Sequence, residues 1–423
     1  MTWTSRRAGV FGRPVLATLL AVLALVASAC GGGAGDEQPT TLRVLMTDDW
    51  VTPTFLDTVR DFERENTNVR IAVDKAPIRE MPDTVRAGLS TGSGPDVVQY
   101  HAFSAASEGL AEPLDDLWAE RLEPAEFFPG ALEDVTWAGK RYGVPLDTNA
   151  LVLILNTEAL RVAGVERPDR PMSFADFGAL ARALTSSDGS RRGIALPTST
   201  WWTMGWVVAN GGELVTVGAD GRPTFGIDSA PVVQAIGFLS DLVRQGVAFP
   251  PRAADSHSSD AFALFQSGTT AVHASGSWDL TKLRTGPQGA IYKAAPMPRG
   301  VTGTTNGSAM GGSSLFVPKG SPNRELAFRF MVHLVSDRYA IRFAREEGRL
   351  PVRERLFADP FFQDAELKVF LEQLRTARPE TLNAFPDAAK AFARAIDQAI
   401  RVGRDAAEAL GEAQRVAEAS VPR

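Results

Sequence analysis

The sequence predicts an α/β protein built from two lobes. Apolar residues alternate with polar ones over 42–46, recur with helical spacing over 55–62, alternate again over 69–73, and form a short apolar run at 97–98. Strand, helix, strand, helix and strand in this order is typical of a parallel α/β sheet. The chain has 423 residues, which is too long for one ordinary core and therefore indicates a second lobe.

A second set of α/β elements is expected from residue 151 onward. Residues 151–155 form a continuous apolar run, as in a strand covered on both faces. Ser173 can cap the following helix, and Asp176, three residues later, would complete a capping box. The middle of the chain, about 187–312, is rich in Gly, Pro, Ser and Thr.

The C-terminal third is predicted to be mainly helical. One helix is expected over 325–335 from its apolar face. Another begins after Pro386, a residue suited to the first turn of a helix, and Gly403 would end it. Asp405 would then cap the last helix, with Glu408 at its third position.

The N-terminus has the pattern of a cleaved signal peptide over residues 1–29. Arg6, Arg7 and Arg13 form a basic segment, and an apolar run of about 12 residues follows over 15–26. A helix that spans a bilayer needs roughly 20 residues, so this run is too short. The pair Arg6-Arg7 leaves both the general secretory route and the twin-arginine route open.

Cys30 is the only cysteine, and small residues directly precede it. This pattern resembles the bacterial lipobox, in which the cysteine is diacylated and becomes the new N-terminus. Two acyl chains suffice for stable anchoring, and residues 30–40, with their glycines, would form a flexible tether. A buried thiol or an intermolecular disulfide is the alternative. We therefore expect an exported protein anchored to the outer face of the cytoplasmic membrane.

The charge and the missing motifs exclude several functions. Removing 29 of the 423 residues leaves 394 and shifts the formal charge from −6 to −9, which argues against a nucleic-acid partner. Nucleophile-elbow, zinc-protease and phosphate-loop motifs are absent, and the four histidines are scattered. We expect no enzyme, no metal and no cofactor. A glycosidase needs only two carboxylates, so it stays open as an alternative.

Six segments, in this order and spacing, together resemble the family 1 extracellular solute-binding proteins, relatives of maltose-binding protein. They are Gly92-Ser93-Gly94-Pro95-Asp96-Val97-Val98, residues 139–156, Ala209-Asn210-Gly211-Gly212, residues 268–278, residues 311–322 and Gly348-Arg349-Leu350-Pro351-Val352-Arg353. The resemblance implies a two-lobe, periplasmic-binding-protein-like (type II) fold with a ligand cleft between the lobes. Lobe 1 would hold 41–147 and 310–350, and lobe 2 would hold 150–308 and 352–423.

The resemblance also implies a function. The chain would be the substrate-binding lipoprotein of an ABC importer, a monomer that closes over a sugar or sugar derivative and delivers it to transmembrane permease subunits. A receptor that presents its ligand to a sensor is the alternative. Ala393 stands where the maltose-binding relative has an aromatic residue, and the chain has only 4 Tyr. A small sugar, a glycerophosphodiester or an amino sugar therefore fits as well as a maltodextrin.

Sugar recognition needs aromatic faces for C–H groups and planar polar groups for hydroxyls. By resemblance, Trp201 and Trp278 are expected to stack on the ligand, and Trp202 is a further candidate. Core packing is the alternative for each of them and the preferred interpretation of Trp206.

The remaining candidates follow strands or lie at crossings between the lobes. They are Asp48, Asp49, Trp50, Tyr100, His101, Asp147, Asn149, Gly311, Gly312 and Arg353. The glycines would let the backbone approach the ligand closely. Hinge structure is the alternative for Asp147 and Asn149, a plain turn for the glycines, and a surface ion pair for Arg353.

Overall fold

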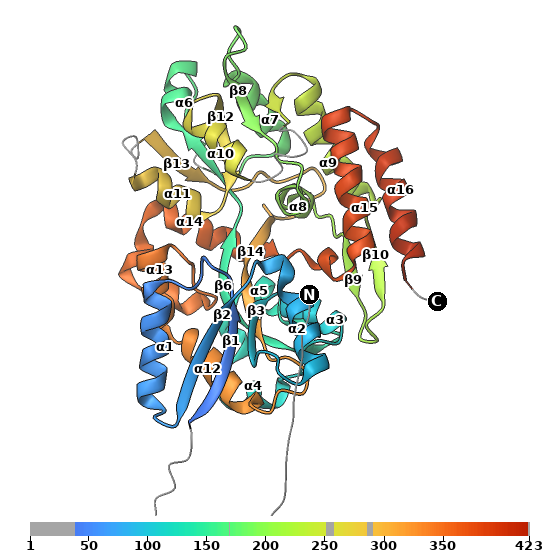
Figure 1. Cartoon of the computed structure of the whole chain (residues 1–423). Coiled ribbons are helices and arrows are strands. Elements are labelled where there is room, and N and C mark those ends of the chain that lie inside the picture. The colour runs from blue at the N-terminus through green and yellow to red at the C-terminus, as the bar shows by residue number, and fades with distance from the viewer. Residues whose placement is uncertain (1–38, 169, 251–257, 286–290, 422–423) are drawn as a thin grey trace, which may run out of the picture. The chain divides into compact units, whose positions relative to one another are not determined.

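The computed structural model describes residues 39–168, 170–250, 258–285 and 291–421. The predicted signal peptide and Cys30 lie outside the described residues. Most strands fall into two mixed β-sheets, each accompanied by helices (Figure 1). Among the described residues, no helix combines the length and the apolar character needed to cross a bilayer.

The first sheet contains the predicted parallel core. Its order is β15-β14-β3-β1-β2, with β6 also paired to β14. β1 pairs in parallel with β2 and β3, which confirms the α/β alternation predicted for the start of the fold. The strands are β1 (Thr40–Met46), β2 (Val69–Lys75), β3 (Val97–Tyr100), β6 (Gly143–Ala150), β14 (Ser308–Phe316) and β15 (Ala377–Arg378). The helices that accompany it are α1 (Pro53–Glu65), α2 (Met81–Thr91), α3 (Ala102–Ser107), α4 (Asp115–Arg121), α5 (Pro129–Glu133), α12 (Arg324–Leu334) and α13 (Asp337–Glu347), with a short 3-10 turn, η1 (Ile78–Glu80), before α2 and another, η2 (Pro124–Glu126), before α5.

The second sheet has the order β11-β8-β12-β7-β13. β8 runs parallel to β11 and β12, whereas β7 runs antiparallel to β12 and β13. Its strands are β7 (Val152–Asn156), β8 (Arg192–Ala195), β11 (Ala248–Phe249), β12 (Thr270–Ser275) and β13 (Tyr292–Ala295). Its helices are α6 (Thr157–Ala163), α7 (Phe174–Ala183), α8 (Thr200–Ala209), α9 (Ala230–Arg244), α10 (Ser258–Gln266) and α11 (Ser277–Thr285).

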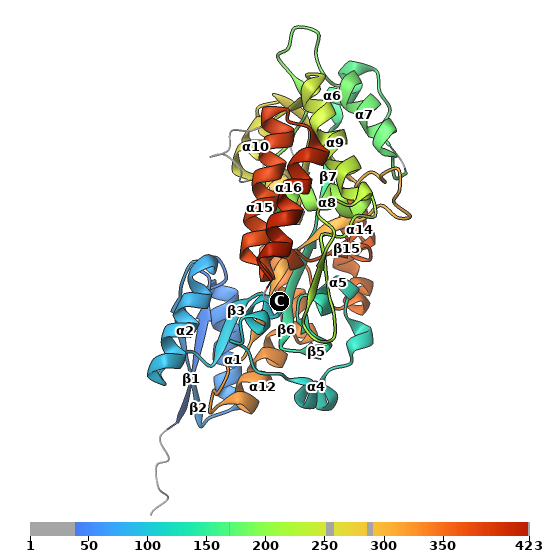
Figure 2. The same cartoon turned by 90° about the vertical axis from the view of Figure 1, so that its right-hand side faces the viewer.

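Three longer helices and several short turns follow α13. α14 (Ala365–Leu374) comes first, and α15 (Pro386–Asp397) and α16 (Ala406–Ala419) lie side by side in both views (Figures 1 and 2). A π-helical turn, η8 (Gln398–Val402), extends α15. The short 3-10 turns are η5 (Glu354–Ala358), η6 (Pro360–Gln363) and η7 (Thr381–Ala384). Two small hairpins pair β4 (Thr136–Trp137) with β5 (Lys140–Arg141), and β9 (Val215–Val217) with β10 (Pro223–Phe225).

The predicted helix ends are confirmed. Ser173 and Asp176 form a complete capping box at the start of α7. Gly403 has a φ of 81° after η8, a left-handed conformation that glycine adopts without steric cost. The Asp405 side chain accepts a hydrogen bond from the Glu408 N–H at the start of α16.

β7 faces two different hydrophobic cores, which explains its continuous apolar sequence. Val152 and Ile154 belong to the core shared with the first sheet, whereas Leu153 and Leu155 belong to the core beneath α7, α8, α9, α15 and α16. All four side chains are fully buried. Residues 352–377 contribute to the core shared with the first sheet, and the predicted lobe boundaries stay a prediction.

β6 and β14 connect the two sheets. They pair from Met310↔Ala150 to Phe316↔Gly143, with a shift of register between Ser313 and Ser314. Gly312 has a φ of 109°, and a Cβ atom there would lie 2.3 Å from the backbone oxygen of Asp147. Only glycine lets the two backbones approach this closely.

Gly312→Ala should therefore lower the free energy of unfolding by about 1–3 kcal/mol, because the added methyl group meets backbone that cannot give way. Urea denaturation measures the change. Gly237→Ala in α9 is the matched control, since nothing lies within 4 Å of its Cβ position; it should be neutral or stabilise by up to about 1 kcal/mol. Equal stability of Gly312→Ala and the wild type would contradict this account of the crossing.

Candidate functional site

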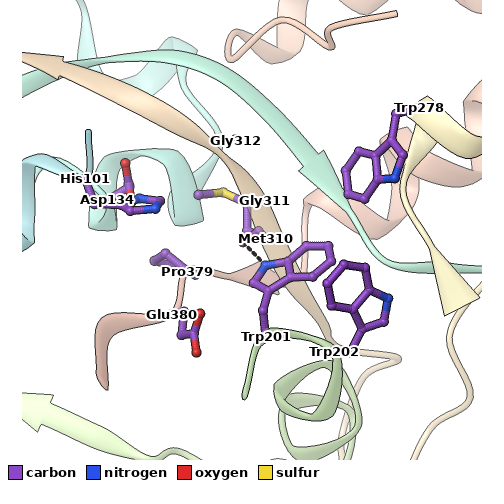
Figure 3. Close-up of a pocket in the computed structure, with 10 residues that line it drawn as sticks. All are labelled: His101, Asp134, Trp201, Trp202, Trp278, Met310, Gly311, Gly312, Pro379 and Glu380. Atoms are coloured by element: carbon purple, nitrogen blue, oxygen red, sulfur yellow. Dashed lines mark hydrogen bonds and ion pairs between the residues drawn. The ribbon is translucent and has the colours of Figure 1, made fainter. Parts of the chain in front are cut away.

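A cavity of about 300 Å³ brings together residues from both sheets (Figure 3). Six of the predicted site residues line it. These are His101, Trp201, Trp202, Trp278, Gly311 and Gly312. Asp134, Met310, Pro379 and Glu380 complete the lining.

The first turn of α8 places Trp201 and Trp202 against the cavity. Trp201 Nε1 donates a hydrogen bond to the Met310 carbonyl oxygen at 2.8 Å, and Trp202 Nε1 donates to the Ala274 carbonyl oxygen at 3.0 Å. The two rings are nearly perpendicular, with centroids 4.7 Å apart. Because both indole N–H groups are satisfied by backbone, the rings offer the cavity apolar surface in fixed orientations.

Trp278 completes an aromatic group that we call the tryptophan wall: Trp201, Trp202 and Trp278. The centroids of Trp278 and Trp201 lie 5.8 Å apart, with an interplanar angle of 38°. A Cβ atom at Gly276 would lie 2.2 Å from the Trp278 ring, so the ring packs against bare backbone. All three tryptophans are partly exposed.

A buried polar cluster fixes the start of α11 and with it Trp278. Asp279 Oδ2 accepts a hydrogen bond from Ser275 Oγ at 2.6 Å and lies 2.9 Å from His273 Nε2. Serine and histidine both face the same carboxylate, so this cluster lacks the serine–histidine contact of a nucleophilic triad. Its role is to hold β12 and the first turn of α11 together.

The two glycines of β14 serve the protein's own packing. A Cβ atom at Gly311 would lie 2.9 Å from the Trp201 ring, and the space at Gly312 is limited by Asp147. These close contacts are made within the protein, so close approach of this backbone to a ligand stays a prediction. Both glycines still form part of the cavity surface.

His101 and Asp134 form a charged pair on another part of the cavity surface. His101 follows β3 and Asp134 follows α5, and His101 Nδ1 lies 2.8 Å from Asp134 Oδ1. Burial disfavours the protonated imidazole, but the charge and the hydrogen bond of Asp134 outweigh it, so the pKa of His101 is raised. In its protonated form, the imidazole balances the charge of the Asp134 carboxylate.

Glu380 lies between β15 and η7 and contributes a second carboxyl group. Burial raises the pKa of Glu380 to about 7, although hydrogen bonds from Asn383 and Thr200 and the charge of His101 work in the other direction. No arginine or lysine belongs to the described lining of the cavity. The described residues form no ion pair with Glu380 either.

Asp147 supports the cavity from behind β14. Its Oδ1 accepts hydrogen bonds from the Ser313 N–H at 2.9 Å and from Ser313 Oγ at 3.1 Å. Burial raises the pKa of Asp147 despite Arg349, whose Nη1 lies 4.0 Å from Oδ2. Arg349 Nη2 also lies 3.2 Å from Asp49 Oδ2, so both predicted acids are engaged with one arginine.

The residues predicted after β1 do not line the cavity. Trp50 is 2% exposed and packs edge-on against Phe343, with Arg349 lying 4.0 Å above its ring. Asp48 is exposed and pairs with Lys75 at 3.3 Å. The chain turns directly after the strand, which directs the indole into the core.

Three further candidates lie outside the described lining. The Asn149 side chain is buried and donates to Ser277 Oγ at 2.7 Å, which ties the first crossing to α11. Arg353 is 8% exposed and pairs with Asp337 at 3.1 Å. Tyr100 contacts His101 edge-on at a centroid distance of 5.6 Å.

Sequence analysis missed Asp134, Met310, Pro379 and Glu380. Asp134 follows a helix of five residues, and Pro379-Glu380 follows a strand of two, so neither element has enough residues to show a periodicity. Met310 could have been found, because it directly precedes Gly311.

The cavity lies among the elements of two α/β sheets and has an aromatic side and a polar side. This arrangement is typical of a protein that binds a small molecule. The chain belongs to the bacterial extracellular solute-binding protein family, whose profile matches residues 57–369.

Individual relatives agree with this family. An uncharacterised lipoprotein of Streptomyces antibioticus is 25% identical over 385 residues, which cover 87% of this chain and 84% of the relative. The diacetylchitobiose binding protein DasA of Streptomyces coelicolor is 25% identical over 360 residues, covering 78% and 79%. The sugar-binding protein MalE of Xanthomonas citri superposes with a TM-score of 0.78 at 23% identity, covering 90% of this chain and 97% of MalE. The predicted two-lobe binding-protein fold is confirmed.

His101→Gln should lower the melting temperature more at pH 5.5 than at pH 9. The folded-state pKa of His101 is raised, so its stabilising contribution is fully present below the unfolded pKa of about 6.5 and is lost as pH rises through the folded pKa. Differential scanning fluorimetry of the wild type and the variant across this range measures the difference.

His333→Gln is the matched control with the opposite trend. Burial lowers the pKa of His333, so the wild type loses stability as pH falls below about 6.5 and the variant does not. A His101→Gln effect of equal size at both pH values would show that the imidazole is not held as a cation.

Proposed function

We propose that this protein is the substrate-binding subunit of an ABC importer and captures a sugar or sugar derivative outside the cell. The observation that carries the proposal is the composition of the cavity. The tryptophan wall supplies aromatic surface, and His101, Asp134 and Glu380 supply polar groups to the same space (Figure 3). Relatives named for maltodextrin and diacetylchitobiose binding support a carbohydrate ligand.

This composition suits the two surfaces of a sugar. Ring C–H groups lose contact with water when they stack on tryptophan, which contributes through buried apolar area. Hydroxyl groups along the edge of the sugar can donate to carboxylates, and hydrogen bonds to charged groups contribute roughly 1.5–3 kcal/mol each. The indoles are held by Met310 and Ala274, so little side-chain entropy is lost when the ligand binds.

Family membership supports the place of this protein in transport. In the proposed cycle, the monomer closes over its sugar and docks on transmembrane permease subunits. Closure would occur where β6 and β14 join the sheets, because hinge residues commonly lie at the ends of elements. The receptor alternative uses the same binding step, and loss of sugar uptake on deletion of the gene would separate the two.

Thermal shift is the direct test of sugar binding. The protein lacking residues 1–30 should show a raised melting temperature with one class of sugar among mono- and oligosaccharides, sugar phosphates, glycerophosphodiesters and peptides, because a ligand of the folded state stabilises it by mass action. Trp278→Ala should weaken binding of that sugar by about 1–3 kcal/mol, as measured by isothermal titration calorimetry.

Trp278→Phe is the control, because it keeps an aromatic face and should keep most of the affinity. A sugar-induced shift that survives Trp278→Ala in full would remove the tryptophan wall from the binding site. A shift with peptides and with no carbohydrate would contradict the proposed ligand class. Release of new reducing ends from bound oligosaccharide would favour the glycosidase alternative.

The second part of the proposal is lipid anchoring through Cys30. The lipobox pattern supports it, and the Streptomyces antibioticus relative is itself named a lipoprotein. Cells grown with labelled palmitate should label the wild-type protein, and Cys30→Ser should lose the label and leave the membrane fraction, because both acyl chains depend on that cysteine. Labelling of the serine variant, or no label on the wild type, would contradict the anchor.

A further inference from the structure

The charges around the cavity leave one carboxyl group without a counter-ion. His101 is paired with Asp134 at 2.8 Å. Arg349, the cation behind β14, is engaged by Asp49, Asp147 and Glu347. No ion pair among the described residues includes Glu380.

The neighbours of Glu380 compensate the negative charge of its carboxylate only in part. The Asn383 side chain from η7, the charge of His101 and the Thr200 side chain from α8 each favour the ionised form of this carboxyl group. Glu380 is partly buried, and withdrawing an ionised carboxylate from water without a partner costs free energy. Either the group takes up a proton, as its pKa of about 7 reflects, or a ligand brings the missing positive charge.

The tryptophan wall favours the same kind of ligand. The faces of tryptophan attract cations through the ring quadrupole, and the indole N–H groups of Trp201 and Trp202 already donate to backbone oxygens. An anionic sugar conjugate, by contrast, would need an arginine or lysine, and the described lining contains neither.

Resting on the proposed sugar binding, we infer that this site selects sugars that carry a basic amine, with Glu380 as the counter-ion of the ammonium group and the tryptophan wall as its aromatic surface. The ligand class is an amino sugar or an amine-bearing oligosaccharide. A neutral sugar would bind by stacking and hydroxyl contacts but would leave Glu380 uncompensated.

Calorimetric titrations at pH 7.0 with matched ligands test this preference. The probes are glucosamine, N-acetylglucosamine and glucose, together with their β-1,4-linked disaccharides. The amine-bearing member of a series should bind about tenfold more tightly than its neutral counterparts, as a charge-assisted contact and a cation–π contact together allow. Glu380→Gln should weaken the amine-bearing ligand most, so that this ratio falls well below its wild-type value, and only the part due to the cation–π contact remains.

Glu325→Gln is the matched control, because it removes the same charge from the exposed surface of α12 and should keep the preference. Equal or weaker binding of the amines, or a preference that Glu380→Gln leaves undiminished, would overturn the inference. Neutral sugars that bind without any amine preference would remove this inference alone. Failure of every carbohydrate in the thermal-shift screen would remove the proposed function as well.

Discussion

The close antiparallel approach of β6 and β14 is the constraint on which the site depends. The missing side chain of Gly312 lets β14 lie against Asp147, and the pairing continues to Met310. That register presents the Met310 carbonyl oxygen to Trp201 and puts Gly311 beneath its ring. The same strands carry the chain between the sheets. The backbone of β14 therefore both connects the sheets and forms part of the cavity surface, at Met310, Gly311 and Gly312.

The cavity has two kinds of surface, fixed aromatic rings and charged side chains that are mostly paired within the protein. Trp201 and Trp202 each donate their indole N–H to a backbone oxygen, so the orientation of both rings is fixed before a ligand binds. The start of α11 is held by Asp279, which accepts from Ser275 and contacts His273, and this holds Trp278 in the same way. The His101–Asp134 pair is likewise complete within the protein. Glu380 differs from these groups because no ion pair among the described residues includes it, and burial raises its pKa to about 7.

Three features could be predicted from the sequence: the first strands of the first sheet, the capping box of α7, and the end of the η8 turn at Gly403. Each is a local pattern with a local physical cause. The tryptophans and His101 were found because their neighbours resemble a known family. Trp50, Asn149 and Arg353 were also predicted as site residues from their positions after strands or at crossings. In the structure Trp50 packs in the core, Asn149 donates to Ser277, and Arg353 pairs with Asp337. Position after a strand does not fix the direction of a side chain. Glu380 could not be found, since the strand before it is only two residues long and the other residues that line the cavity are distant in sequence.

The position of Ala393 bears on the size of the ligand. It lies in α15 beside a separate surface depression, with Thr198, Thr200 and Arg394, and contributes nothing to the described lining of the tryptophan cavity. The aromatic residues that line the cavity therefore come from α8 and α11, and none of the described lining comes from α15 or α16. A cavity of about 300 Å³ stands at the lower end of small-molecule sites. Three tryptophans gathered in so small a space favour a tight grip on one or two sugar rings over an extended chain, because a longer chain would need further stacking surfaces beyond the wall.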